Sequence, residues 1–188
     1  MKSRPQSGDG AAPEASTGLP GAHCEIAFQA AIRYLAVRPY SVAELKQKLR
    51  SKSLGSNAID ETVARLKKLG FLDDRKLAEQ YASSLARNRA FGRFRVEREL
   101  RVRRLDPRTV EPALRAAFEE TDERALLDKV LDQKLCRLRL PLTRPRLAAL
   151  LASLRRRGFR TDDIIRAVRA RPELAPVAED ADLGALEE

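Results

Sequence analysis

Apolar positions recur three times along this chain in the same order and with almost the same spacing. Seven apolar residues of the first stretch match seven that lie 51 positions later, and these match seven more a further 54 positions along. In each stretch they follow helical periodicity over three segments that are separated by two turns. The three sets are Ile26, Ala31, Leu45, Leu49, Leu54, Ile59 and Val63; Leu77, Ala82, Val96, Leu100, Leu105, Val110 and Leu114; and Leu131, Cys136, Leu150, Leu154, Phe159, Ile164 and Val168. The recurrence predicts three copies of one unit of about 50 residues, near the upper limit of helical-repeat lengths.

The composition also favours helices. The chain of 188 residues has no Trp and only 5% aromatic residues, and the helix formers Leu, Ala, Arg and Glu dominate. We therefore predict an all-α fold, an elongated array of three tandem three-helix repeats. Repeat 1 is predicted to span residues 22–72, repeat 2 residues 73–120 and repeat 3 residues 121–171. Residues 1–21, which are rich in Pro and Gly, and the acidic residues 172–188 are predicted to be disordered.

Residues that start and stop helices lie where these repeats require them. Pro39 predicts that the first helix, over about 23–38, ends ahead of it. Ser41 and Glu44 have the spacing of a capping box at the start of the second helix, and Gly70 is placed to end the third. The corresponding signals in the later repeats are Asp73-Asp74, Asp106-Pro107, Thr121-Asp122 and Thr161-Asp162-Asp163. Each repeat is therefore expected to hold three helices.

Charge is distributed unevenly along the chain. The formal net charge is +10, of which residues 122–171 contribute +8, whereas residues 172–188 contribute −6. The predicted array is thus more basic than the whole chain. Such a field suits a polyanionic partner, which is either a nucleic acid or an acidic protein groove.

The strongest candidate for a binding surface is the basic stretch 87–104, which contains eight arginines together with Phe91 and Phe94. Helical geometry directs Val96 and Leu100 inward and Arg95, Arg98 and Arg101 outward. Arginine forks bind phosphate or carboxylate, and aromatic rings stack on bases. Together with the basic end of the second helix of repeat 3, the candidate binding residues are Arg93, Arg95, Arg98, Arg101, Arg104, Arg155, Arg156 and Arg157.

A purely structural interpretation of the same residues stays open. A solvated basic helix, partly neutralised by Glu97 and Glu99, explains the first cluster, and the two phenylalanines are equally consistent with core positions. The helix dipole alone explains three arginines at a helix C-terminus, over 155–157.

No catalytic or metal-binding pattern stands out, so we expect neither an enzyme nor a cofactor. The chain has no phosphate-binding Gly-rich loop and a single histidine, His23, and its paired acids Asp73-Asp74 and Asp162-Asp163 open helices. Cys24 and Cys136 are expected to be small buried residues without a disulfide or metal. No apolar stretch approaches membrane-spanning length and no secretory signal is present, so we expect a cytoplasmic protein.

Several short segments, in this order, resemble the RecX regulatory proteins that control the RecA recombinase. The matching segments, within about residues 24–170, are Tyr34-Leu35, 38–45, Leu69-Gly70-Phe71-Leu72-Asp73-Asp74 with Ala78, Gly92-Arg93, and Arg156-Arg157-Gly158-Phe159. Two positions depart from the family pattern: Leu77 stands where Phe is frequent, and Arg103-Arg104 stand where a Lys-Gly-type turn is usual.

The resemblance implies a non-enzymatic, monomeric regulator that binds the RecA–single-stranded-DNA filament in its groove. It further implies inhibition of filament extension, ATP hydrolysis, strand exchange and the co-protease function that sets off the SOS response. The arginines named above are then the candidate filament contacts. Two alternatives stay open: a sequence-specific double-stranded DNA-binding protein, and a helical scaffold for an acidic protein partner.

Overall fold

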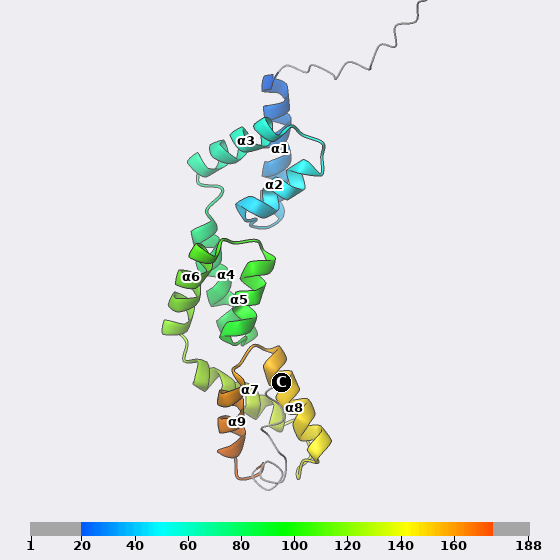
Figure 1. The fold of residues 1–188 in the computed structure, drawn as a ribbon, viewed down its shortest axis with the longest axis vertical. Helices are drawn as coiled ribbons and strands as arrows, with labels where there is room; N and C mark the ends of the chain where they lie inside the picture. The colour runs from blue at the N-terminus through cyan, green and yellow to red at the C-terminus, as the bar shows by residue number, and fades with distance from the viewer. Residues whose placement is uncertain (1–19, 175–188) are drawn as a thin grey trace, which may run out of the picture.

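The computed structural model describes residues 20–174, and these contain nine helices and no strand. The helices form three groups that follow one another along the long axis of the molecule (Figure 1). Their bounds are α1 Pro20–Val37, α2 Val42–Arg50 and α3 Ser56–Lys68 in repeat 1; α4 Asp74–Arg89, α5 Arg93–Val102 and α6 Pro107–Glu119 in repeat 2; and α7 Glu123–Leu135, α8 Arg144–Arg156 and α9 Thr161–Arg169 in repeat 3. The predicted all-α, elongated array of three tandem three-helix repeats is confirmed.

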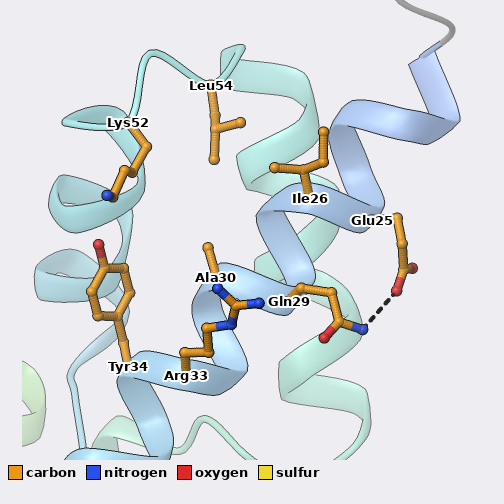
Figure 2. Close-up of a pocket in the computed structure, with 8 residues that line it drawn as sticks. All are labelled: Glu25, Ile26, Gln29, Ala30, Arg33, Tyr34, Lys52 and Leu54. Carbon is orange, nitrogen blue, oxygen red and sulfur yellow. Dashed lines mark hydrogen bonds between the residues drawn. The ribbon is translucent and has the colours of Figure 1, made fainter.

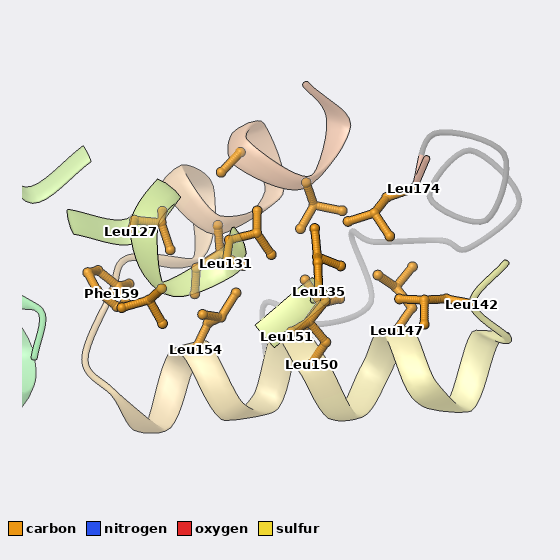
Figure 3. Close-up of a cluster of buried hydrophobic side chains, with 14 of the residues drawn as sticks. Leu127, Leu131, Leu135, Leu142, Leu147, Leu150, Leu151, Leu154, Phe159 and Leu174 are labelled. Atoms are coloured by element: carbon orange, nitrogen blue, oxygen red, sulfur yellow. The ribbon is translucent and has the colours of Figure 1, made fainter. Parts of the chain in front are cut away.

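Each repeat has a hydrophobic core of its own. The principal helix packings all lie within a repeat, so α4, for example, packs on α5 and α6. Leu45 and Leu49 are fully buried in the first core and Leu100 and Leu114 in the second, and Leu131 is fully buried in the third (Figure 3). Because the three cores are separate, neighbouring repeats are joined mainly at the ends of helices.

The recurring apolar positions are buried in the structure with three exceptions. Ile26 is 56% exposed, Leu54 is half-buried and Cys136 is exposed. The expectation that Cys136 is buried is therefore wrong. Helix α7 ends at Leu135, so Cys136 caps the helix where the chain turns out of the core.

Cys24 also departs from its expected place. It is half-buried rather than buried, and its Sγ donates a hydrogen bond to Glu61 Oε2 at 2.8 Å. This bond to a carboxylate raises the pKa of the Cys24 thiol. Within residues 20–174, no cluster of His, Cys, Asp and Glu is suited to hold a metal ion.

The helix signals in the sequence act as predicted. Ser41 Oγ accepts a hydrogen bond from the amide of Glu44 at 3.1 Å, while the Glu44 carboxylate accepts one from the amide of Ser41 at 3.0 Å, which completes the capping box. Asp106 caps α6 and Pro107 is its first residue. Gly70 follows α3 with φ of 76°, a left-handed conformation that stops the helix.

The predicted limits of the array are wrong at both ends. Pro20 and Gly21, assigned to the disordered arm, belong to α1, because proline is tolerated in the first turn of a helix. Leu174, assigned to the disordered tail, is fully buried and extends the third core. The rest of those two segments, residues 1–19 and 175–188, lies outside the described residues.

The turn after the second helix has a left-handed residue at the same place in all three repeats. Ser53, Arg104 and Gly158 are related by the 51- and 54-residue offsets, and their φ angles are 57°, 56° and 89°. Arg104 therefore adopts the left-handed conformation that glycine adopts at position 158. The Cβ of a residue in this conformation costs about 1–2 kcal/mol.

We expect Arg104→Gly to raise the free energy of unfolding by about 0.5–1 kcal/mol, because the strain at φ of 56° disappears while the unfolded chain gains freedom. Urea denaturation measures the change. Arg104→Lys keeps both the charge and the Cβ, so its stability should equal that of the parent. A glycine variant no more stable than the lysine variant would show that the turn is unstrained.

Candidate polyanion-binding surface

The second helices of repeats 2 and 3 meet end to end. The amide of Gly92, the N-cap of α5, donates to the carbonyl of Arg157, the C-cap of α8, at 2.8 Å, and the amide of Phe94 donates to the carbonyl of Gly158 at 3.2 Å. A Cβ on Gly92 would lie 2.5 Å from the Gly158 oxygen, and one on Gly158 would lie 2.2 Å from the nitrogen of Arg95. Only glycine fits at either position, so the two backbones touch directly.

The second helices of repeats 1 and 2 also meet end to end, through side chains that donate to backbone carbonyls. Ser41 Oγ, at the start of α2, donates to the carbonyl of Arg103, the C-cap of α5, at 2.6 Å. Arg103 donates from Nη1 to the carbonyl of Pro39 at 3.3 Å, and its guanidinium lies 4.0 Å from the centre of the Tyr81 ring. Carbonyls at the end of one helix therefore find donors at the start of the next.

The three second helices consequently form one head-to-tail line in the order α8, α5, α2. They run along the same edge of the array, and α3, α6 and α9 run along the other (Figure 1). We call this line the second-helix edge. Helix α5 alone has 10 residues and is about 15 Å long. Because α8 and α2 continue the line at its two ends, the edge is much longer than a single helix.

A carboxylate stabilises each of the two places where one second helix meets the next. Asp74 Oδ1 accepts a hydrogen bond from the amide of Val42 at 2.9 Å, and Glu123 Oε1 accepts one from the amide of Arg93 at 2.8 Å. Both amides belong to the first residue of a second helix, where the dipole favours negative charge. Burial nevertheless raises the pKa of both carboxyl groups.

The raised pKa of Glu123 makes stability depend on pH. Because the folded state binds the proton more tightly than the unfolded state, the contribution of Glu123 declines as pH rises from the ordinary carboxyl pKa through the raised one. We expect Glu123→Gln, which keeps an acceptor oxygen, to remove this decline. Urea denaturation at about pH 4.5 and about pH 7 measures it. Glu119→Gln, at an exposed position on α6, is the control, and an equal pH dependence in both variants would contradict the prediction.

Three of the eight candidate arginines contact other groups of the protein. Arg93 Nη2 lies 3.0 Å from a carboxylate oxygen of Glu111, and Arg95 Nη2 lies 2.7 Å from one of Glu99. Arg157 donates from Nη1 to the backbone carbonyls of residues 89 and 90 at 3.0 and 3.3 Å, which ties α8 to repeat 2. Each of these guanidinium groups therefore has a partner within the protein, and only that of Arg157 connects two repeats.

The other five candidates face solvent. Arg98, Arg104 and Arg156 are exposed, and within the described part of the chain their side chains form no ion pair or hydrogen bond. The side chain of Arg101 is 66% exposed, although it pairs with Glu97. Arg155 is exposed in the last turn of α8.

Two exposed apolar side chains lie among the arginines of α5. Phe94 is 55% exposed and Val102 is 70% exposed. Phe94, Arg98 and Arg101 are spaced four and three residues apart, so they share one face of the helix. Phe91, by contrast, is partly buried against the second core. The sequence left both phenylalanines open between core and surface, and only Phe94 presents its ring for stacking.

Arg50 is a contact candidate that the sequence analysis did not include, and the repeat offset reveals it. Arg50, Arg101 and Arg155 occupy the same position in the three repeats, and each is exposed in the last turn of a second helix. The offset itself was the available signal. An exposed guanidinium thus recurs along the whole second-helix edge.

Two of the three repeats match models of one protein family. A model described as the first three-helix domain of RecX matches residues 27–66, and one described as the second three-helix domain matches residues 73–114. A relative from Pelodictyon phaeoclathratiforme named "Regulatory protein RecX" is 30% identical over 139 residues, which cover 74% of this chain and 84% of the relative. This chain belongs to the RecX family.

Further RecX proteins agree with this assignment. "Regulatory protein RecX" of Chlorobaculum tepidum is 30% identical over 143 residues, which cover 76% of this chain and 86% of the relative. The crystal structure of RecX from Lactobacillus salivarius has a TM-score of 0.69 at 21% identity and covers 84% of this chain and 99% of that one. The latter likeness supports the all-α RecX fold.

The RecX domain models cover only part of the candidate surface. The second model includes Arg98, Arg101 and Arg104, whereas Arg155 and Arg156 lie beyond both matched ranges. Among helices α1 to α9, none combines the length and the apolar character needed to cross a membrane.

Proposed function

We propose that this RecX-family chain binds the RecA–single-stranded-DNA filament in its groove and inhibits recombinase activity. The inhibited activities are filament extension, ATP hydrolysis, strand exchange and co-protease function, so the chain regulates recombination, DNA repair and the SOS response without catalysis of its own. The observation that carries the proposal is the second-helix edge, with exposed arginine at the same position in each repeat.

A repeating partner suits this edge on energetic grounds. A single exposed ion pair contributes only about 0–1 kcal/mol, so no one arginine provides useful affinity. Three repeats whose second helices are joined by hydrogen bonds present several such contacts at once, and each contact raises the effective concentration of the next. A filament offers the same surface again and again, and therefore gains most from this arrangement.

The face of α5 provides the residues proposed for DNA contact within the filament. Arg98 and Arg101 are suited to phosphate oxygens, and the Phe94 ring is suited to stack on an unpaired base. Such contacts are insensitive to base sequence. Specific retention of one duplex sequence at moderate salt would instead favour the alternative of a sequence-specific double-stranded DNA-binding protein.

The test is a titration of the purified chain into RecA engaged in DNA-dependent ATP hydrolysis. We expect the rate to fall at fewer than one regulator per RecA protomer, because one array spans more than one protomer. The titration is repeated with excess single-stranded DNA, which separates filament binding from sequestration of bare DNA. An unchanged ATPase rate, or inhibition that excess DNA abolishes, would contradict the proposal.

A further inference from the structure

A groove on repeat 3 has an apolar floor and a cationic rim. Its volume is about 340 Å³, and it lies between the end of α7 and the exposed side of α8. Leu138, Ala149 and Leu150 form the floor. The cations that line it are Lys134, Arg137 and Arg146. Within residues 20–174 none of these three cations forms an ion pair, so the groove lacks an internal counter-charge.

Further positive charge surrounds this groove. Burial lowers the pKa of Lys134, and the nearby guanidinium groups of Arg157, Arg156 and Arg137 lower it further. Four cations therefore repel one another at the end of α7. A ligand that brings carboxylates and apolar side chains together would relieve this repulsion and cover the floor.

The chain itself contains a segment that combines carboxylates with apolar side chains, and this segment follows repeat 3 in the sequence. Residues 175–188 contain five acidic residues and no basic one, and Leu183 and Leu186 lie between Asp182 and Glu187. Leu183 and Leu186 match the apolar floor, and the flanking carboxylates match the cationic rim. No segment of this length elsewhere in the chain has so negative a net charge.

The starting point and length of the segment also fit. Leu174, the last described residue, is fully buried at the same end of the third core as Leu142 and Leu147, which flank the start of α8 (Figure 3). The groove begins within this first turn of α8, at Arg146. Residues 175–188 span about 46 Å when extended or about 21 Å as a helix, and α8 is about 20 Å long. Either form reaches the whole groove.

The groove on repeat 1 offers a contrast. It is larger, about 560 Å³, and is lined by Ile26, Tyr34 and Leu54 among others, with Arg33 and Lys52 at its edge (Figure 2). It also holds a carboxylate of its own, at position 25, and it lies in repeat 1, at the opposite end of the array from repeat 3 (Figure 1). Charge and reach both favour the groove on repeat 3.

We propose that residues 179–188 dock in the groove on repeat 3, with Leu183 and Leu186 on its floor and the flanking carboxylates on Arg137 and Arg146. The docked segment covers the cations next to Arg156 on the second-helix edge. It thereby restricts access of a polyanion to repeat 3.

The test uses the full chain and a spin label on Cys136, which is exposed between groove residues Lys134 and Arg137. Cys24→Ser leaves this thiol as the single labelling site. We expect the amide NMR signals of residues 182–187 to lose most of their intensity through paramagnetic broadening. The signals should recover in Arg137→Gln/Arg146→Gln, because the rim has lost two of its three cations.

A matched control and a mixing experiment complete the test. Arg108→Gln/Arg115→Gln removes the same charge from exposed positions on α6 and should leave the broadening intact. Absence of broadening, or equal broadening in both double variants, would overturn the proposal. Broadening that appears only between a labelled chain and a separate isotope-enriched chain would also overturn it, since the segment would then dock on a second copy.

A separate experiment measures whether the docked segment restricts access of a polyanion to repeat 3. This experiment rests on the proposed function. Asp182→Asn/Glu187→Gln should bind the RecA–DNA filament about three- to tenfold more tightly than the parent chain. Unchanged binding would show that the groove lies outside the filament contact. The spin-label result contains no RecA or DNA, so failure of the proposed function leaves it interpretable.

Discussion

Gly158→Ala is expected to destabilise the chain by about 3 kcal/mol or more and to loosen repeat 3 from repeat 2. A Cβ at position 158 would lie 2.2 Å from the nitrogen and 2.4 Å from the Cβ of Arg95, and φ is 89°. The variant thus suffers both a clash and backbone strain. The helix ends can relieve the clash only by separating, which breaks the bond from Gly92 to Arg157. Urea denaturation measures the loss of stability.

Two further glycine variants separate the clash from the strain. Gly70→Ala has φ of 76° with no atom within 4 Å of the new Cβ, so it should cost only the strain, about 1–2 kcal/mol. Gly92→Ala has an ordinary φ of −72° but meets the Gly158 oxygen at 2.5 Å, so it should cost only the clash. A loss at Gly158 no greater than that at Gly70 would contradict direct backbone contact between repeats.

Arg98→Glu/Arg101→Glu is expected to weaken binding to the RecA–DNA filament by about 100-fold, which corresponds to about 2.7 kcal/mol. Both side chains project from the exposed face of α5, so the reversal replaces attraction with repulsion while the buried face of the helix is unchanged. The lost pair between Arg101 and Glu97 is exposed and contributes about 0–1 kcal/mol. Filament binding by fluorescence anisotropy and inhibition of ATP hydrolysis measure the effect.

The matched control reverses the same amount of charge on the opposite edge. Arg108→Glu/Arg115→Glu changes two exposed arginines of α6, which runs along the edge of the array opposite the second-helix edge (Figure 1). Net charge falls equally in both double variants. We expect the control to bind the filament nearly as tightly as the parent chain. Equal losses in the two variants would show that overall charge, rather than the second-helix edge, determines binding.

The fold was predictable because its signals are local or periodic. Leu45, Leu100 and Leu154 are each fully buried at positions that the apolar pattern identified, and the cap residues Ser41 and Asp106 act where they were predicted to act. Turn chemistry and periodicity each involve residues a few positions apart, so the sequence displays them directly.

The roles of the individual arginines were not predictable in this way. Arg98 and Arg157 have the same side chain within equally basic segments, yet Arg98 faces solvent while Arg157 binds backbone carbonyls of the neighbouring repeat. The difference depends on which carbonyl groups the array brings near each guanidinium. The burial of Leu174 was not predictable either. The residues around it have the composition of a disordered tail, and only the three-dimensional structure shows that Leu174 packs into the third core.

The most direct test of the account compares one charge reversal from each repeat at the same repeat position. Arg50→Glu, Arg101→Glu and Arg155→Glu are each expected to weaken binding to the RecA–DNA filament by about tenfold, and the triple variant by about the product. This result is predicted because the second helices form one continuous edge that contacts a repeating partner. A loss confined to a single repeat, or unchanged binding of all three variants, would contradict it.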